Sequence, residues 1–223
     1  MVKLKTPRLP EADGARSGKS APNNLPLKLL MLGDSAAAGV GVSHQDEALA
    51  GNLVDALAEN FCVDWQLIAW SGCKTADMLA HLKNKPQKSI DVVVTSLGVN
   101  DVTSSISAEK WLALQVKLLA SLRTRFSPKL IIFSAIPPMA EFPALPRPLN
   151  LLLGERAEKF NRLVKAYLST QRDCQFLAIR FNPQDGIVAI DGFHPGPAGY
   201  QMWGQAAAKL ITSQLLPLES EVS

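Results

Sequence analysis

The chain has 223 residues, of which 47% are hydrophobic and 19% charged, so it is long enough and apolar enough to bury the core of one α/β domain. Its net charge of +3 does not by itself indicate nucleic acid, and no nucleic-acid partner is expected. The three cysteines have no paired short spacing, which argues against a zinc site or a disulfide framework and favours free thiols in a reducing compartment.

Residues 1–25 are rich in Lys, Arg, Pro, Gly, Ser and Ala, and they predict a flexible, basic N-terminal arm because they offer little to bury. A secretory signal would place its apolar stretch within these residues, but here they are polar, so no signal segment is expected. No stretch of the chain reaches the roughly 18 to 20 uncharged apolar residues that span a bilayer. We therefore expect a cytoplasmic protein without stable membrane insertion, with its globular domain over residues 26–216 and a C-terminal tail over 217–223.

A mostly apolar run at residues 27–32 predicts a buried parallel strand that ends at Gly33-Asp34-Ser35. Further strands are predicted at 63–69, 89–97, 129–135 and 175–179, and helices at about 46–60, 75–82, 107–126, 150–171 and 195–215. Thr75 and Ser107 are placed to cap two of these helices. The alternation of strands and helices indicates an α/β fold with a five-stranded parallel sheet, right-handed crossovers and helices on both faces.

Polar or glycine residues stand out in the otherwise apolar surroundings of four strand ends, at Ser35, Gly72, Asn100 and the segment 191–194. Loops at the carboxyl ends of parallel strands converge in space. In the last segment, Asp191 and His194 lie three residues apart, so the carboxylate can fix the imidazole tautomer and leave the other ring nitrogen as a general base. Together with Ser35, these two residues match the serine, histidine and aspartate of a catalytic triad.

An acyl-transfer serine also needs hydrogen-bond donors aimed at the developing oxyanion. Three donors lie at suitable strand ends: the backbone N–H of Ser35, the backbone N–H of Gly72 and the side-chain amide of Asn100. Asp101, next to this asparagine, is predicted to accept hydrogen bonds from backbone amides of its own loop.

A Pro-rich loop at 137–148 follows the fourth predicted strand and carries Met139, Phe142 and Leu145. These apolar side chains have two interpretations, which the sequence does not separate. In the first they form the wall of an acyl-binding pocket, and in the second they are an apolar clamp over the core.

The sequence resembles the SGNH (GDSL) hydrolase family over about residues 27–215, on four blocks in family order: Gly33-Asp34-Ser35, Ser71-Gly72, Gly98-Val99-Asn100-Asp101 and Asp191-Gly192-Phe193-His194. The resemblance implies a flavodoxin-like three-layer αβα fold and esterase or lipase-type activity. It also implies Ser35 as nucleophile, His194 as base, Asp191 as its partner, and Gly72 and Asn100 in the oxyanion hole. No metal or organic cofactor is needed for this chemistry.

Ala36 stands where many members of the family have leucine, and Trp70 precedes the second block where others have an Asn-rich turn; both departures bear on substrate preference. The expected function is a serine carboxylic-ester hydrolase that acts through an acyl-enzyme on small-molecule esters with short to medium acyl chains. An acyl thioesterase or lysophospholipase, and a carbohydrate O-deacetylase, would use the same residues. A non-catalytic binding protein that contacts its partner through the basic arm is the alternative from a different class.

Overall fold

The apolar run after residue 26 forms strand β2 (Leu25–Gly33) in the interior of a six-stranded sheet. This is a computed structural model, and it describes residues 7–20, 25–178 and 187–216. The sheet order is β1-β3-β2-β4-β5-β6, with bounds β1 (Ser17–Lys19), β3 (Phe61–Ala69), β4 (Val92–Ser96), β5 (Leu130–Ser134) and β6 (Cys174–Leu177). Leu29, Met31 and Leu32 of β2 are fully buried, as expected for a strand that is covered on both faces.

Strands β3, β2, β4, β5 and β6 run parallel to one another, which confirms the predicted α/β fold. In this flavodoxin-like order, β2 pairs with the strand that follows it on one side and with β4 on the other. The register places Gly33 beside Ala69 and also beside Ser96. The loops that follow β2, β3 and β4 therefore leave the sheet at the same level, at the point where the winding changes direction.

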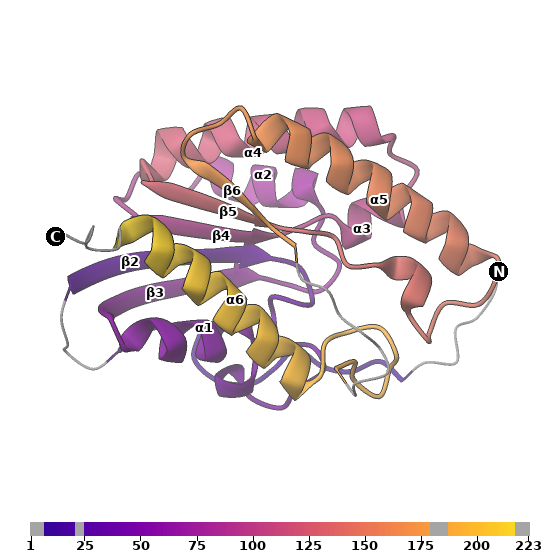
Figure 1. The fold of residues 1–223 in the computed structure, drawn as a ribbon, viewed down its shortest axis with the longest axis horizontal. Helices are drawn as coiled ribbons and strands as arrows, with labels where there is room; N and C mark the ends of the chain where they lie inside the picture. The colour runs from indigo at the N-terminus through magenta and orange to yellow at the C-terminus, as the bar shows by residue number, and fades with distance from the viewer. Residues whose placement is uncertain (1–6, 21–24, 179–186, 217–223) are drawn as a thin grey trace, which may run out of the picture.

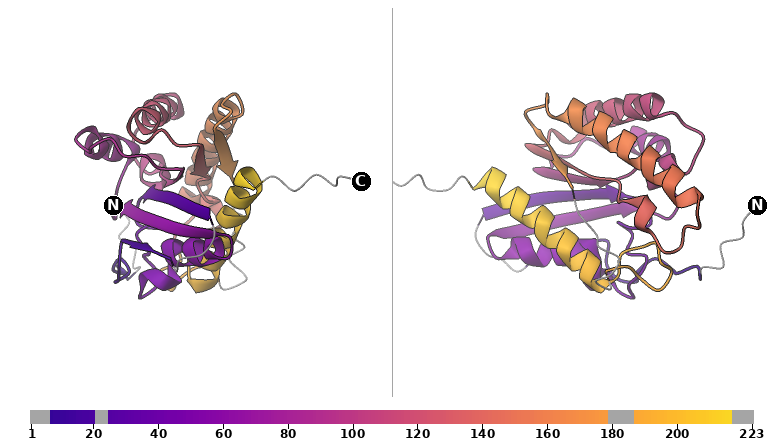
Figure 2. Two further views of the ribbon diagram at one scale, coloured as in Figure 1. Left: turned by 90° about the vertical axis from the view of Figure 1, so that its left-hand side faces the viewer. Right: turned by 45° about the vertical axis from the view of Figure 1, so that its right-hand side comes forward.

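Helices cover both faces of the sheet and make the three layers visible in Figures 1 and 2. On one face α1 (Leu49–Ala58) and α6 (Pro197–Leu215) pack side by side, and on the other lie α2 (Thr75–Lys83), α4 (Ala108–Phe126) and α5 (Leu149–Leu168). Short helices occur at η1 (Gln45–Glu47), α3 (Val99–Val102) and η2 (Met139–Glu141). None of the helices in the described ranges is long and apolar enough to cross a membrane.

The N-terminal arm is predicted to be flexible, and this is wrong for the described residues from Glu11 onward, which pack on the domain. Residues Ser17–Lys19 form β1, antiparallel to β3, so the sheet has one strand more than the five predicted and is not wholly parallel. Ala12 is only 5% exposed, so its side chain is buried against the domain. The pairing uses backbone N–H and C=O groups at the free edge of β3, which needs no apolar side chains. Residues 1–6, 21–24 and the tail at 217–223 lie outside the described ranges, as does the predicted end of the last strand at residue 179.

A buried polar network joins α2, α3 and α4 behind the strand ends. The Thr75 hydroxyl donates to Asp101 Oδ2 at 2.8 Å, and it accepts from Trp111 Nε1 at 3.1 Å and Gln115 Nε2 at 2.9 Å. The predicted capping role of Thr75 is therefore wrong, since Lys74 is the N-cap residue of α2. Asp101 also bonds away from its own loop, because its carboxylate accepts the Thr75 N–H at 3.1 Å. Ser107 does cap α4, with its hydroxyl accepting the Lys110 N–H.

Thr75→Val removes the hydroxyl but keeps the shape, so the buried donors of Trp111 and Gln115 lose their acceptor and Asp101 keeps only the Thr75 N–H. We expect the free energy of unfolding to fall by about 3 kcal/mol, because each unpaired buried polar group costs on the order of 1 to 3 kcal/mol. Urea titration measures this loss. The matched control is Thr124→Val on the exposed side of α4, whose hydroxyl bonds to the carbonyl of Ala120 and whose loss should change stability by less than about 0.5 kcal/mol. Equal losses in the two variants would contradict the role of the network.

Asp34 is a second buried acid, 2% exposed, directly after β2. Burial raises its pKa from 3.8 to about 7, and the negative charge of Asp101 acts in the same direction, although the Ala36 N–H bond to its carboxylate opposes the shift. The folded protein thus holds the Asp34 proton more tightly than the unfolded chain does. The contribution of this group to stability is therefore greatest below the unfolded-state pKa and declines as the pH rises toward 7.

Asp34→Asn should remove this pH dependence. Between pH 4 and pH 7, relative to the variant, we expect wild type to lose a few kcal/mol of unfolding free energy, because each pKa unit corresponds to about 1.4 kcal/mol. Urea titrations of both proteins at several pH values give their free energies of unfolding. Subtracting one from the other cancels the contributions of the other carboxylates, which both proteins share. A stability difference between the two proteins that does not change with pH would contradict the raised pKa.

Candidate active site

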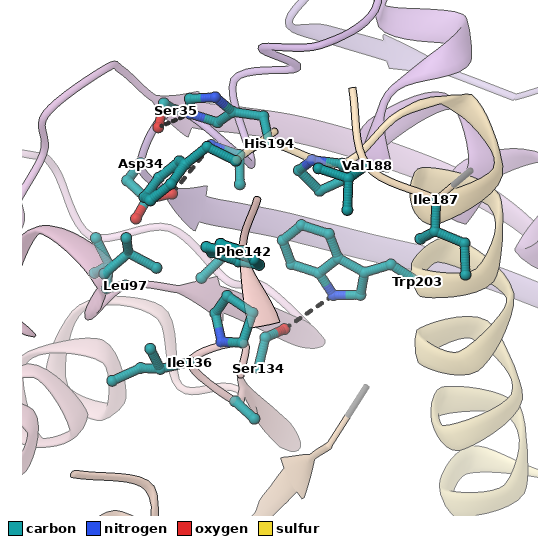
Figure 3. A pocket seen from close by; sticks show the side chains of 17 residues that line it. Asp34, Ser35, Leu97, Ser134, Ile136, Phe142, Ile187, Val188, His194 and Trp203 are labelled. Carbon is teal, nitrogen blue, oxygen red and sulfur yellow. Dashed lines mark hydrogen bonds between the residues drawn. The ribbon is translucent and has the colours of Figure 1, made fainter. Parts of the chain in front are cut away.

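The four predicted strand-end segments meet at one edge of the sheet, at the switch between β2 and β4. Ser35 follows β2, the Ser71-Gly72 turn follows β3, Asn100 lies in α3 after β4, and the loop with His194 leads into α6. Open α/β sheets bind ligands in the crevice outside the carboxyl ends of their strands at such a switch point. The pocket in Figure 3 is at this edge.

The turn with Ser35 depends on the absence of a side chain at Gly33. A Cβ atom there would lie 2.3 Å from that of Ala37 and 2.9 Å from the carbonyl oxygen of Ser96, so β2 and β4 end in backbone contact. The Asp34 carboxylate accepts the N–H of Ala36 at 3.1 Å and so fixes the residue that follows the serine. The small residues after Ser35 are therefore required for packing as well as for access to its hydroxyl.

Tyr200 of α6 holds the same turn from the other side, a role that sequence patterns do not indicate directly. Its hydroxyl contacts the carbonyl oxygens of Ala36 at 2.8 Å and Val40 at 2.7 Å, and its side chain is fully buried. Burial, followed by the charges of Asp34 and Asp191, raises the Tyr200 pKa well above its usual range, so the hydroxyl stays a donor. The sequence indicates only that Tyr200 and Trp203, three residues apart, lie on the same face of the last helix.

Ser35, His194 and Asp191 form a continuous hydrogen-bonded chain. The Ser35 Oγ lies 2.8 Å from His194 Nε2, and His194 Nδ1 lies 2.6 Å from Asp191 Oδ2. The second carboxylate oxygen of Asp191 accepts the N–H groups of Phe193 and His194, both at 3.0 Å. The Asp191 side chain is 6% exposed and that of His194 is 18% exposed, so the contact is shielded but open on the side of the serine.

The environment keeps Asp191 ionised. Burial raises its pKa, but the hydrogen bond from the His194 ring and the two backbone N–H bonds outweigh this and lower it below the usual range. A carboxylate next to Nδ1 fixes the proton on that ring nitrogen. His194 Nε2 is then free to accept the proton of Ser35.

The Ser71-Gly72 turn follows β3 at the same edge. The Cys73 N–H donates to the carbonyl of Trp70 at 3.2 Å, and Gly72 has φ = +79°, the geometry of a type II turn that requires a glycine at its third position. No atom lies within 4 Å of where a Gly72 side chain would begin, so space is open in front of this turn. Among the described residues, the N–H groups of Ser35 and Gly72 have no hydrogen-bond acceptor.

Asn100, the third predicted donor, has its side-chain amide tied to the neighbouring loops. Its Nδ2 donates to the carbonyl of Cys73 at 3.1 Å and makes a longer contact of 3.4 Å with Asp34 Oδ2. The asparagine thereby connects the turn after β3 with the turn after β2. The contact to Asp34 is long for a hydrogen bond.

An apolar cavity of about 50 Å³ adjoins Ser35 and His194. Phe142 lines it, as predicted, but Met139 and Leu145 do not: they are 0% and 7% exposed and belong to the core, which matches the interpretation as a clamp. The apolar walls that the sequence did not indicate are Leu97, Val99, Ile136, Val188 and Trp203. Figure 3 shows the contact of Ser35 with His194 on one side of the cavity and, on the opposite side, the 3.1 Å bond from Trp203 Nε1 to the Ser134 hydroxyl.

Two further features of this edge concern metal ligands and Cys73. No three His, Cys, Asp or Glu side chains gather there or elsewhere in the described ranges as a metal site would require. Cys73 is fully buried, and burial, with the charges of Asp34, Asp77 and Asp101, raises its pKa to about 12, so it is not a thiolate nucleophile at neutral pH.

Comparison with solved structures finds the same fold in several esterases. A carbohydrate esterase family 2 enzyme with a carbohydrate binding domain from Corynascus thermopiles (Myceliophthora fergusii) aligns with a TM-score of 0.71 and 18% identity, over 88% of this chain and 68% of that one. The carbohydrate acetylesterase Est24 from Sinorhizobium meliloti aligns with a TM-score of 0.62 and 19% identity, over 84% and 99%. A lipolytic protein of the G-D-S-L family from Veillonella parvula aligns at 0.63 and 18%, over 83% and 98%.

Sequence comparison gives the family. No curated protein matches the chain significantly. Residues 31–202, which include all four blocks described above, match the GDSL-like Lipase/Acylhydrolase family. The chain therefore belongs to the GDSL-like lipase/acylhydrolase (SGNH) family, whose members hydrolyse ester bonds.

Proposed function

We propose that this esterase is a serine carboxylic-ester hydrolase in which Ser35, His194 and Asp191 carry out the reaction through an acyl-enzyme. The observation that carries the proposal is the hydrogen-bonded chain from the Ser35 hydroxyl to His194 at 2.8 Å and from His194 to Asp191 at 2.6 Å. These contacts join a nucleophile to a base and the base to an orienting carboxylate, which is the arrangement that covalent catalysis needs.

In the first half of the reaction, Ser35 Oγ attacks the carbonyl carbon of the ester while His194 Nε2 takes the hydroxyl proton. Asp191 stabilises the imidazolium that forms. The tetrahedral intermediate then expels the alcohol, which receives the proton from His194, and an acyl group remains on Ser35. In the second half, water attacks this acyl group with His194 as the base, and the carboxylic acid leaves.

The negative charge of the tetrahedral intermediate needs donors that are already in place. We assign this role to the N–H groups of Ser35 and Gly72, which have no acceptor among the described residues, and to the Asn100 amide, which would exchange its long contact with Asp34 for one with the oxyanion. Asp34 supports these donors because its carboxylate contacts both the turn after Ser35 and the Asn100 amide.

Ser35→Ala should abolish turnover of a short p-nitrophenyl ester, with a fall in kcat of about four to six orders of magnitude, because the covalent route is lost. Absorbance of released nitrophenolate measures it. Ser169→Ala, which removes an exposed hydroxyl at the end of α5, should keep wild-type turnover.

Labelling with a fluorophosphonate probe, followed by mass spectrometry, tests the same assignment independently. Wild type should react at Ser35, and His194→Ala should react far more slowly because the hydroxyl loses its base. Undiminished turnover in Ser35→Ala, or the absence of labelling in wild type, would contradict the mechanism and favour a binding protein.

The cavity next to Ser35 supports a preference for short acyl groups. Its volume of about 50 Å³ is well below the roughly 150 Å³ of an apolar protein cavity that holds benzene. Phe142 closes one wall, held edge to face against Phe193 with ring centroids 5.0 Å apart. We expect an acyl chain of a few carbons to fit this space better than a longer one.

A series of p-nitrophenyl esters from acetate to decanoate should therefore show kcat/KM that peaks at a few carbons and falls with longer chains. Phe142→Ala should move the peak to longer chains, since it removes a wall of the cavity. Met139→Ala is the matched control, because Met139 is also buried in the same loop but does not line the cavity, and it should keep the wild-type profile. An unshifted peak in Phe142→Ala, or the same shift in both variants, would contradict this pocket.

A carbohydrate O-deacetylase is the second candidate, and the small volume of the cavity favours it over enzymes for long acyl chains. Two of the structural neighbours described above are named as carbohydrate esterases. Release of acetate from acetylated xylooligosaccharides, at a kcat/KM well above that for alkyl acetates, would support this candidate. A preference for short acyl-CoA in the same panel would instead indicate a thioesterase.

A further inference from the structure

A segment of the N-terminal arm, residues 11–16, crosses two of the loops that form the active site; we call it the strap. Its first contacts are with the loop that follows Ser35. The Ala12 N–H donates to the carbonyl of Ala38 at 3.2 Å. The Gln45 side-chain amide donates to the carbonyl of Ala12 and to that of Ala38. Asp13 forms a bridge alongside His44.

The strap then reaches the turn that follows β3 through two charged side chains. Glu11 Oε1 accepts the N–H of Ser71 at 2.6 Å, and Arg16 donates to the carbonyl of Ala69 at 2.6 Å. Glu11 and Arg16 are also joined to each other, Oε2 to Nη2, at 2.6 Å. Their side chains are 30% and 37% exposed, so the pair is partly shielded from solvent.

These contacts constrain the turn next to the Gly72 N–H, which is one of the proposed oxyanion donors. Ser71 is the second residue of the turn and Gly72 the third. Type I and type II turns differ mainly by rotation of the peptide group between these two residues, and that group carries the Gly72 N–H. The Glu11 carboxylate holds the preceding N–H, so it constrains the conformation from which the Gly72 N–H projects. A glycine, with no side chain to restrict it, has little preference of its own.

We propose that Glu11 is a positioning residue that holds the Gly72 N–H in place for the oxyanion, and that Arg16 orients Glu11 for this task. The proposal rests on the function proposed above, since it acts through one of the oxyanion donors. It gives the basic arm a part in the active site that its composition did not indicate.

The charge state of Glu11 is consistent with this role. Burial raises its pKa, but the bonds from Ser71 and the charge of Arg16 outweigh this and lower it below 4.5. A carboxylate whose folded-state pKa is lowered contributes its interaction above the unfolded-state pKa and loses it as the pH falls. Glu11 is therefore an ionised acceptor at the neutral pH at which His194 acts as a base.

Glu11→Ala tests the role with p-nitrophenyl butyrate as substrate and butylboronic acid as an inhibitor that forms a tetrahedral adduct with serine. Loss of an oxyanion donor costs on the order of 100- to 1,000-fold in kcat, and a donor that is loosened costs less, so we expect kcat and kcat/KM to fall about tenfold with KM unchanged. The inhibition constant should rise by a similar factor. Rates are expressed per active site, titrated with a fluorophosphonate.

Two variants separate positioning from stability. Glu11→Gln keeps an oxygen that can accept the Ser71 N–H, and it should recover most of the lost kcat. Glu109→Ala is the matched control, because it breaks an equally short ion pair, with Lys159 at 2.6 Å, on the exposed side of α4 and α5. The proposal would be overturned if Glu11→Ala kept the wild-type kcat per active site and only its urea midpoint fell. It would also be overturned if Glu109→Ala lost as much kcat as Glu11→Ala.

Ser35→Ala in the same assay separates the two proposals. Turnover that does not depend on Ser35 would overturn the proposed function and with it the role of Glu11. Turnover that depends on Ser35 but is unchanged in Glu11→Ala would overturn the role of the strap alone.

Discussion

The pairing of Gly33 with both Ala69 and Ser96 is the constraint on which the site depends. It brings the ends of three parallel strands to one level, so that the loops after β2, β3 and β4 have to share the same space. Contact this close is possible because position 33 has no side chain and the residues after Ser35 are small. The remaining polar contacts, from Asp34, Asn100 and Tyr200, then connect loops that the sheet has already placed together.

The sequence was sufficient for the parts of the structure that depend on local patterns. Buried parallel strands require nearly continuous apolar runs, which is why β2 and β4 were located to within a few residues. The same holds for the pair Asp191 and His194, because three residues of separation in a turn already allow a hydrogen bond. The contact of His194 with Ser35 spans 159 residues, and it was predicted from strand order and family resemblance together, not from local pattern.

The features that were missed depend on partners far away in the chain. Strand β1 has a polar sequence and forms because β3 offers an unpaired edge, which composition does not reveal. Asp101 bonds to Thr75 across 26 residues where a local turn contact was expected. In the loop at 137–148, Phe142 and Met139 have similar apolar character, and only the three-dimensional path of the backbone decides which one faces the cavity.

The arrangement of α6 has a consequence for how the protein is made. This helix starts just after His194, holds the Ser35 turn through Tyr200 and contributes Trp203 to the cavity, yet it is the last helix of the described chain. Ribosomes deliver the chain from its N-terminus, so Ser35 is synthesised 159 residues before His194, which its hydroxyl contacts in the folded protein. The hydrogen bond between Ser35 and His194 therefore cannot form until nearly the whole chain has been made, and the contacts of Tyr200 with the Ser35 turn follow only when α6 docks.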